Sequence, residues 1–240
     1  MSSPAIALAP SVYRIPTVRF DLLNTYAFVD DDGSVTLVDC GLPFSAPRIV
    51  AGLAAFGKAP QDVRRVVLTH SHGDHVGGAS AVLAHTGVDG VLVHAQDAGY
   101  ARTGTNPPRD RSRLLGRLMD RPAKPGKPAF PPVEVSRELV DGEVLPVAGG
   151  LRVIHTPGHS PGHVSLLHAP SGVLVTGDAI WNVLRLSYGI AGFCADVAMT
   201  RRTAAVLGDL EYTTAAFTHG PHVSDRARER VRSFVAAAPR

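Results

Sequence analysis

Six consecutive positions of this chain, 70–75, hold three histidines and one aspartate. They directly follow the apolar run 66–68, which reads as a buried strand, and they precede a glycine pair that opens a helical pattern over about 77–84. Burying four such polar groups without partners would cost several kcal/mol. A purely structural or surface role therefore fits poorly, and the stretch predicts a metal site at the end of a strand.

The order of these side chains predicts two metals rather than one. If the chain is still extended at His70, its side chain and that of His72 point to the same side and can chelate one ion. Asp74 and His75 follow Gly73, which permits a sharp turn, so this pair faces elsewhere. A second ion about 3.5–4 Å from the first would meet the pair there, as in two-metal hydrolytic centres.

Composition narrows the class of protein. With 240 residues, 45% of them hydrophobic, and no repetitive tract, we expect one domain over 1–240. The formal net charge of +3 suits an anionic small-molecule substrate and is too weak to indicate a nucleic-acid partner. We expect no membrane association, because no window approaches about 20 apolar residues and the N-terminal stretch lacks a secretory pattern.

The two cysteines, Cys40 and Cys194, lie far apart and form no C-x-x-C pair. A reduced, cytoplasmic setting fits this usage best, although a disulfide between them stays open.

Hydrophobic periodicity indicates an alternation of strands and helices. Strands are predicted over 11–20, 24–29, 35–38, 64–68, 91–94, 144–147, 151–155, 164–168, 173–176 and 215–217. Helices are predicted over about 46–56, 77–84, 111–119, 197–210 and 225–237, with a short one after 95. Two β-rich halves, each accompanied by helices, indicate two sheets packed face to face with helices outside.

A basic, proline-rich segment spans about 100–132, with seven prolines between Pro107 and Pro132. We expect that such a segment cannot be core and interpret it as a surface insertion. Its place between two ligand-bearing segments suggests a lid or rim, and a solvated loop without a role in binding fits equally well.

Three further candidate ligands each follow a predicted strand. His159 lies in a Thr-Pro-Gly-His turn, Asp178 in a Gly-Asp pair and His219 in a Thr-His-Gly turn. Loop residues at the end of a rigid sheet are where ligands are expected, so these three can join the cluster at 70–75.

Together these segments resemble the metallo-β-lactamase superfamily, whose pattern is H-x-H-x-D-H, then T-P-G-H, a G-D aspartate and a late histidine. The resemblance covers nearly the whole chain and implies an α+β fold, a four-layer αββα sandwich of two mixed sheets with helices on the outer faces. It implies two metal ions with a shared ligand between them. By position, the first metal takes His70, His72 and His159, the second takes Asp74, His75 and His219, and Asp178 is the bridge. Zinc suits these ligands, and so do iron and manganese.

Other residues are expected to support these ligands. In the resemblance, the second histidine of the turn, His163, supports the loop rather than binding metal, and Asp39 resembles a carboxylate behind the first metal site. His222 is close enough to His219 in sequence to line the mouth of the site.

The segment after Asp178 is apolar and aromatic, and it is a candidate wall of an acyl or lactone pocket. Trp181 and Tyr188 belong to it, and Tyr188 is the phenol there that could assist an oxyanion. Packing beneath the insertion is an equally good interpretation of these residues.

The ligand set predicts a dinuclear zinc-dependent hydrolase. Two ions that share a hydroxide provide a nucleophile near neutral pH, because metal binding lowers the pKa of water toward about 7. Asp74 can orient this hydroxide and pass on its proton, and Asp178 holds the two ions together. This chemistry hydrolyses an ester, thioester, lactone or lactam.

The resemblance leaves the branch of the superfamily open. Glyoxalase II carries a C-terminal substrate domain for which no room is expected after His219, and β-lactamases generally lack the bridging aspartate. Lactonases place a tyrosine soon after that aspartate, where this chain has Ile180-Trp181-Asn182. A mononuclear iron sulfur dioxygenase is the alternative from another class, and a nuclease is a weaker one because the interval from His75 to His159 is too short for an extra domain.

Overall fold

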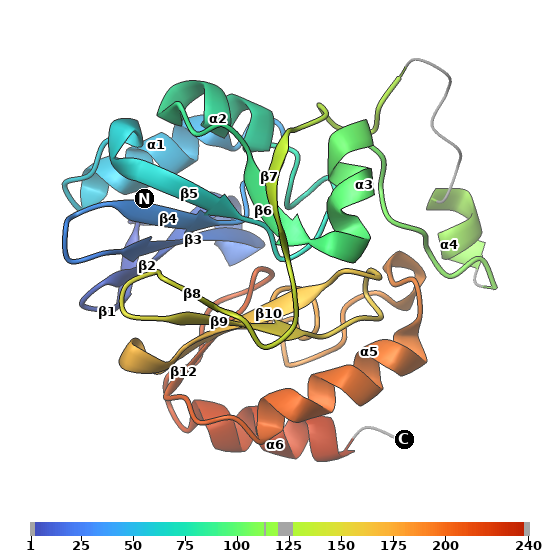
Figure 1. Cartoon of the computed structure of the whole chain (residues 1–240). Helices are drawn as coiled ribbons and strands as arrows, with labels where there is room; N and C mark the ends of the chain where they lie inside the picture. The colour runs from blue at the N-terminus through green and yellow to red at the C-terminus, as the bar shows by residue number, and fades with distance from the viewer. Residues whose placement is uncertain (1–2, 113, 120–126, 238–240) are drawn as a thin grey trace.

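Two β-sheets lie face to face between two layers of helices in the computed structural model, which describes residues 3–112, 114–119 and 127–237. Helices α1 (Ala46–Ala55) and α2 (Ala79–Thr86) cover one sheet, and α5 (Val197–Ala204) and α6 (Ala227–Ala237) cover the other (Figure 1). The expected four-layer αββα sandwich of the α+β class is confirmed.

The larger sheet contains seven strands in the order of the sequence. They are β1 (Ile6–Ala9), β2 (Val12–Val18), β3 (Leu23–Val29), β4 (Val35–Val38), β5 (Val63–Val67), β6 (Val91–His94) and β7 (Val135–Leu139). Each pair of neighbours from β1 to β4 is antiparallel, and each pair from β4 to β7 is parallel. The sheet is therefore mixed, and β4, β5 and β6 end at the same edge.

The smaller sheet contains five strands in the order β12-β11-β10-β9-β8. Their bounds are β8 (Val144–Leu145), β9 (Leu151–His155), β10 (Val164–His168), β11 (Val173–Val175) and β12 (Thr214–Ala216). Because β10 is antiparallel to β9 and β11, and β12 is parallel to β11, the strands β9, β11 and β12 point in one direction. Their carboxyl ends share one edge of this sheet.

These two edges meet. The N–H of Val164 donates to the carbonyl of Thr69 at 2.8 Å, and the N–H of Asn24 donates to the carbonyl of Thr218 at 2.9 Å. Segments that are far apart in the sequence, namely those after β4, β5, β6, β9, β11 and β12, are thereby gathered in one place. The topology alone brings the candidate ligands together.

Large apolar side chains fill the space between the sheets. Tyr26 and Phe28 from β3, and Leu151 and Leu166 from the smaller sheet, have no exposed surface there. Two further apolar clusters lie under the outer helices, one beneath α1 and α2 and one beneath α5 and α6. The site is thus mounted on a densely packed scaffold.

Replacement of Phe28 by alanine tests this packing. The ring is fully buried and meets the His168 ring at 5.3 Å. We expect the free energy of unfolding of the metal-free protein to fall by about 3–5 kcal/mol, measured by denaturant titration. The matched control is Phe44→Ala, whose side chain is 68% exposed and should cost less than about 0.5 kcal/mol. A loss below about 1 kcal/mol for Phe28→Ala would contradict the described core.

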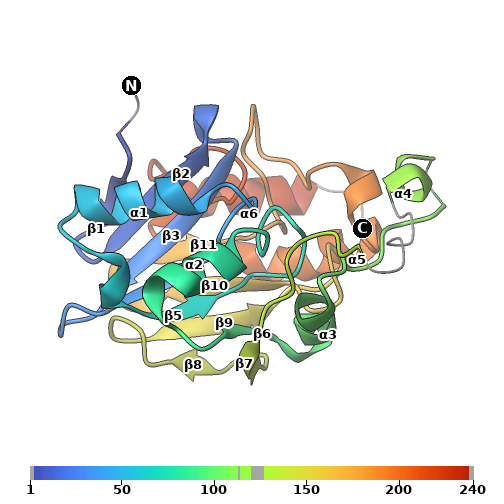
Figure 2. The same ribbon diagram turned by 90° about the horizontal axis from the view of Figure 1, so that it is seen from above.

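The segment 100–132 is only partly a surface excursion. It begins within α3 (Ala95–Thr103) and includes α4 (Leu114–Met119), which projects at one end of the molecule (Figure 2). The expectation that it contains no core is wrong for Phe130, which is 3% exposed. The N–H of Ala129 donates to the carbonyl of Gly104, so this end of the segment folds back onto α3 and buries the ring. Residues 113 and 120–126, including three of the expected basic side chains, lie outside the described residues.

Several predicted bounds also differ from the observed ones. The sequence does not predict strands β1 and β7, which are the two edges of the larger sheet. In β7, three exposed polar residues lie between two buried apolar ends, so apolar and polar residues do not alternate as in a half-buried strand. The helix predicted over 197–210 ends at Ala204 and continues as a single-turn helix. Such turns span Arg19–Asp21, Pro60–Asp62, Ala169–Ser171, Ala191–Phe193 and Ala205–Gly208.

Of the helices that the structure describes, none is both long and apolar enough to cross a bilayer.

Candidate metal centre

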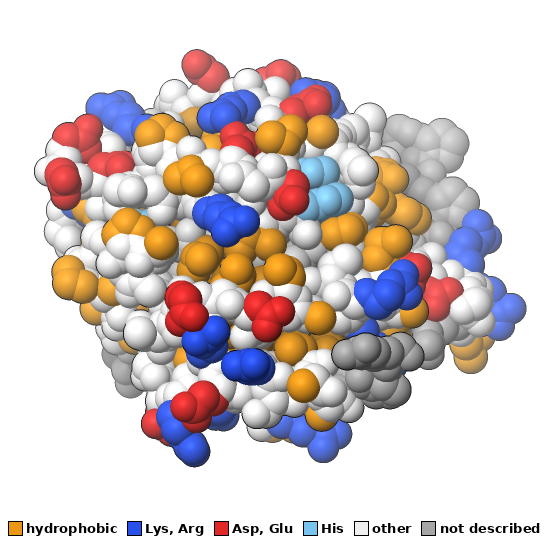
Figure 3. Space-filling view, turned by 60° about the horizontal axis from the view of Figure 1, so that its bottom comes forward, with side chains coloured by type: hydrophobic (Ala, Val, Ile, Leu, Met, Phe, Trp, Pro, Cys, Tyr) orange, Lys and Arg blue, Asp and Glu red, His pale blue; other side chains and the backbone are white. Residues whose placement is uncertain are grey.

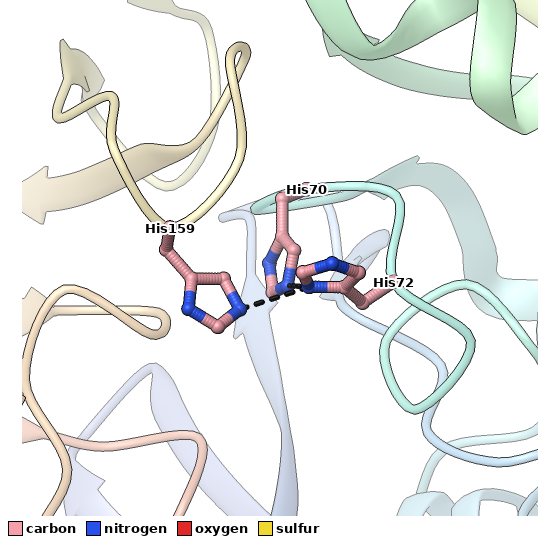
Figure 4. A group of neighbouring side chains, drawn as sticks. All are labelled: His70, His72 and His159. Atoms are coloured by element: carbon pink, nitrogen blue, oxygen red, sulfur yellow. Dashed lines mark hydrogen bonds between the residues drawn. The ribbon is translucent and has the colours of Figure 1, made fainter. Parts of the chain in front are cut away.

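Three imidazole nitrogens converge on one point at the edge where the sheets meet. His70 and His72 come from the loop after β5, and His159 comes from the loop after β9 (Figure 4). His72 Nδ1 lies 3.0 Å from His70 Nε2 and 2.8 Å from His159 Nε2. Burial lowers the pKa of His72 to about 4 and that of His159 to about 3, and it holds the pKa of His70 well below its usual value. The three-histidine group therefore consists of neutral rings whose lone pairs can bind a cation.

Asp74, His75 and His219 form a second group beside the first. Asp74 Oδ2 lies 3.4 Å from His219 Nε2 and 4.0 Å from His75 Nε2. This mixed group joins the loop after β5 to the loop after β12. The two groups are adjacent, because the His70 and His75 rings lie 3.9 Å apart between their centroids and, with Asp178, also form a potential metal-binding set.

Asp178 lies between the two groups. Its Oδ2 is 3.2 Å from His159 Nε2, while its Oδ1 is 3.3 Å from His75 Nε2 and 3.4 Å from His219 Nε2. Burial acts to raise the pKa of this carboxyl, but the His219, His75 and His159 rings outweigh it and hold the pKa well below its usual range. One carboxylate oxygen thus faces each group.

The negative charges of the carboxylates raise the pKa values of the two histidine rings in the mixed group. Burial acts to lower the pKa of His75, yet the carboxylates of Asp178, Asp39 and Asp74 raise it well above its usual value. The pKa of His219 likewise rises to about 10, because Asp178 and Asp74 outweigh its burial. These positions attract positive charge.

Unsatisfied atoms provide a test of whether metal fits here. His75 Nε2, His219 Nε2 and Asp178 Oδ1 are buried and have no hydrogen-bond partner. Buried polar atoms without partners are costly, and three of them converging on one point call for a cation. Nitrogen and carboxylate oxygen donors are those that zinc and related divalent ions accept. The residues fit divalent metal ions.

Asp39 fixes the ring of His75. Its Oδ2 accepts a hydrogen bond from His75 Nδ1 at 2.9 Å, and its Oδ1 accepts one from the N–H of Thr69 at 2.8 Å. His75 then carries its proton on Nδ1 and leaves Nε2 available as a ligand atom. Asp39 also contacts the Thr69 hydroxyl at 2.8 Å, which lies 3.1 Å from His70 Nδ1, so its direct histidine contact is with the mixed group and its contact with the three-histidine group runs through Thr69.

Replacement of Asp39 by asparagine is expected to weaken zinc binding at the mixed group by about 10–100-fold. An asparagine oxygen can still accept from Thr69, but its NH₂ cannot accept the proton of His75 Nδ1. The backbone φ of +61° at this position is tolerated by asparagine, so the variant isolates the hydrogen bond. Zinc affinity is measured by competition with a chromophoric chelator. Asp32→Asn, an exposed turn carboxylate, is the control, and equal affinities in the two variants would refute the role of Asp39.

His163 holds the backbone of Asp178. Its Nε2 accepts a hydrogen bond from the Asp178 N–H at 2.8 Å, and its Nδ1 donates to the carbonyl of Thr156 at 3.1 Å. Both ring nitrogens are therefore occupied by protein partners, and the supporting role of His163 stays a prediction. The contact is close, because a Cβ on the preceding Gly177, where φ is +54°, would lie 2.6 Å from His163 Nε2.

The aromatic residues after Asp178 have different surroundings. The Trp181 ring packs against the His219 ring with centroids 4.1 Å apart, so it does border the candidate ligands. Tyr188 instead packs its ring against Phe234 of α6, at 4.6 Å. Its contacts are with the outer helical layer, which gives no support to an oxyanion role.

His219 is also held by the backbone. Its Nδ1 donates to the carbonyl of Leu22 at 2.8 Å, which directs Nε2 toward the mixed group. His222 is half-buried, and its pKa is lowered by burial and by the nearby Arg14. Among the described residues, His222 does not belong to the clusters of ligand atoms.

Three contacts at the site were not predicted. The carboxylate of Asp97 accepts hydrogen bonds from two ligand loops, Cys194 Sγ lies 3.5 Å from His159 Nδ1, and Asn106 Oδ1 accepts from the Gly73 N–H at 3.0 Å. Asp97 could have been found, because it lies just past the end of β6, beside the strands that end in Asp39 and His70. Cys194 and Asn106 follow no strand, so sequence alone gives no such signal.

Comparison with known proteins places the fold and its pattern in context. Residues 19–219 match the family model of the metallo-beta-lactamase superfamily. The probable metallo-hydrolase YflN of Bacillus subtilis is 35% identical over 62% of this chain and 57% of its own length. The acyl-coenzyme A thioesterase MBLAC2 of Gallus gallus is 35% identical over 61% of this chain and 53% of its own length. The chain thus matches little more than half of each relative.

A solved structure is similar over nearly the whole chain. The Rm3 metallo-beta-lactamase superposes with a TM-score of 0.72 at 23% identity, covering 98% of this chain and 90% of that one. At this identity the likeness concerns the fold.

Proposed function

This chain belongs to the metallo-beta-lactamase superfamily, and from that premise we propose that it is a dinuclear metal-dependent hydrolase of a small-molecule acyl substrate. The observation that carries the proposal is the position of Asp178, with Oδ2 at 3.2 Å from His159 Nε2 and Oδ1 at 3.3 Å from His75 Nε2. A single carboxylate shared by two ligand groups is the arrangement that a two-metal centre requires.

In this proposal each ligand group holds one divalent ion, and zinc is the first candidate. His70, His72 and His159 would hold one ion, Asp74, His75 and His219 would hold the other, and Asp178 would be shared between them. When bound, such a pair of ions polarises a substrate carbonyl and brings the pKa of water toward neutrality.

The residues of the chain have separate tasks around that centre. Asp74 orients a water molecule and accepts its proton, because its side chain is the most exposed of the seven candidate ligands. The neighbouring His75 ring holds the pKa of the Asp74 carboxyl below its usual value and keeps it ionised. Trp181 covers the ring of His219 and keeps water from that side. Asp39 and His163 orient His75 and Asp178.

A thioester is the first substrate class to examine, followed by esters, lactones and lactams. The thioesterase activity in the name of the chicken relative favours this order. An anionic group on the substrate suits the formal net charge of +3. On the face in Figure 3, basic and acidic side chains are interspersed, which does not favour a nucleic-acid partner there.

We also propose a reduced, cytoplasmic setting, because Cys40 and Cys194 are both buried and not joined in a disulfide.

The test is hydrolysis of a panel of acyl thioesters, aryl esters, lactones and β-lactams by the metal-loaded protein. We expect turnover of at least one class, loss of turnover after chelation and recovery with zinc. Hydrolysis that is unaffected by metal removal would refute the proposal. One iron per chain, no hydrolysis of any class and oxygen consumption with a persulfide would instead support the sulfur dioxygenase alternative.

A further inference from the structure

Asp97 is a fully buried carboxylate that belongs to no ligand group. It lies in the first turn of α3, directly after β6 of the larger sheet. A carboxylate without surface exposure needs several donors to offset its desolvation, so its partners show what it holds.

Those partners lie in two loops that carry the three-histidine group. Asp97 Oδ2 accepts from the N–H of Ser71 at 2.9 Å and from Ser160 Oγ at 2.8 Å, and Oδ1 accepts from the N–H of Gly162 at 2.7 Å. Ser71 separates His70 from His72, while Ser160 directly follows His159. One carboxylate therefore joins the loop of the larger sheet to the loop of the smaller sheet.

The packing around Asp97 allows little relaxation. The hydroxyl of Ser71 also donates to the Asp97 carbonyl at 3.0 Å. A Cβ on Gly162 would lie 2.6 Å from the Asp97 nitrogen, so the loop rests directly on the start of α3. Loss of the carboxylate would leave three buried donors without an acceptor, at about 1–3 kcal/mol each, and the cheapest response is a separation of the loops that admits water.

The mixed group has anchors of its own that do not involve Asp97. Asp39 fixes His75 at 2.9 Å, and the carbonyl of Leu22 fixes His219 at 2.8 Å. The Asp74 carboxylate faces His219 and His75, at 3.4 and 4.0 Å. A disturbance at Asp97 should thus reach one ligand group and not the other.

We propose that Asp97 is a positioning residue that sets the distance between His159 and the His70–His72 pair, and so controls metal affinity at the three-histidine group alone. This inference rests on the proposed two-metal function and deepens it. The matched control is Asp30, a carboxylate that also joins the two sheets, through the N–H of Ala148, but at a distance from the candidate ligands.

The experiment measures zinc affinity by competition in two single-site backgrounds. In His219→Ala protein, which retains the three-histidine group, we expect Asp97→Asn to weaken zinc binding by about 10–100-fold. In His72→Ala protein, which retains the mixed group, we expect Asp97→Asn to leave zinc binding unchanged. Asp30→Asn should leave the zinc affinity unchanged in both backgrounds. Asparagine keeps the shape of the side chain but offers a single oxygen, so it cannot serve all three donors.

A second measurement uses the metal-free protein and does not depend on zinc. Amide hydrogen exchange at Ser71 and Gly162 should be faster in Asp97→Ala than in the wild type, while exchange in β3 is unchanged. If Asp97→Ala does not fold, the Asp97→Asn variant decides the question.

The outcomes separate the two claims. Unchanged zinc affinity of Asp97→Asn in the His219→Ala background, or equal weakening in both backgrounds, would overturn the role of Asp97. If the wild type itself binds fewer than two zinc ions, the proposed dinuclear function fails first.

Discussion

Replacing Asp178 with alanine is expected to lower kcat by more than about 100-fold while leaving the fold intact. Mutation of a residue that merely orients a metal ligand typically costs 10–100-fold, and Asp178 has an oxygen directed at each ligand group. Its removal leaves His75 and His219 facing each other without the carboxylate that attracts positive charge to both. Steady-state kinetics on the substrate identified by the panel, with circular dichroism for the fold, provides the measurement.

Two variants sharpen this result. Asp209→Ala, an exposed carboxylate on the outer helical side, should retain wild-type kcat. Asp178→Asn keeps the hydrogen bond from the backbone to His163 and the size of the side chain, so its loss of activity reports the charge and the second carboxylate oxygen. Wild-type kcat and metal content in Asp178→Ala would refute the bridging assignment.

Removal of metal is expected to lower the melting temperature by more than about 10 °C. A ligand present at about 1,000 times its Kd stabilises the folded state by about 4 kcal/mol, and two sites contribute separately. Each kcal/mol corresponds to roughly 2–4 °C for a protein of this size. Part of this stabilisation comes from buried atoms that have no hydrogen-bond partner without metal, namely His75 Nε2, His219 Nε2 and Asp178 Oδ1.

Thermal unfolding with and without chelator measures this shift, and added zinc should reverse it. A variant with both His72→Ala and His219→Ala lacks a ligand in each group and serves as the control, because its melting temperature should not respond to the chelator. An equal response in the control and the wild type would mean that the chelator acts elsewhere.

Sequence reasoning located the candidate ligands because each follows a strand. A histidine or aspartate just after an apolar run can be recognised from a single sequence, and parallel strands then bring the residues to a common edge. His70, His159 and His219 follow three separate strands, β5, β9 and β12, and all three belong to the adjacent ligand groups at one edge of the sheets. The fold class followed from the same alternation of strands and helices.

Contacts between the loops could not be predicted in the same way. The direct contact of Asp39 with His75 depends on the turn at Gly73, which brings His75 back over the end of β4. Asp97 follows a strand as the ligands do, but no sequence pattern reveals its contacts, since its three donors come from positions 71, 160 and 162. Phe130 shows a further limit, because a proline-rich composition does not reveal one buried ring. The organisation of 1–240 as one domain stays a prediction.

Elemental analysis of protein purified without chelator tests the two-metal assignment most directly. The account requires close to two divalent metal ions per chain, and a value near one in both His72→Ala and His219→Ala. A wild-type protein that holds no metal, or only one ion that is lost in His72→Ala and kept in His219→Ala, would contradict it.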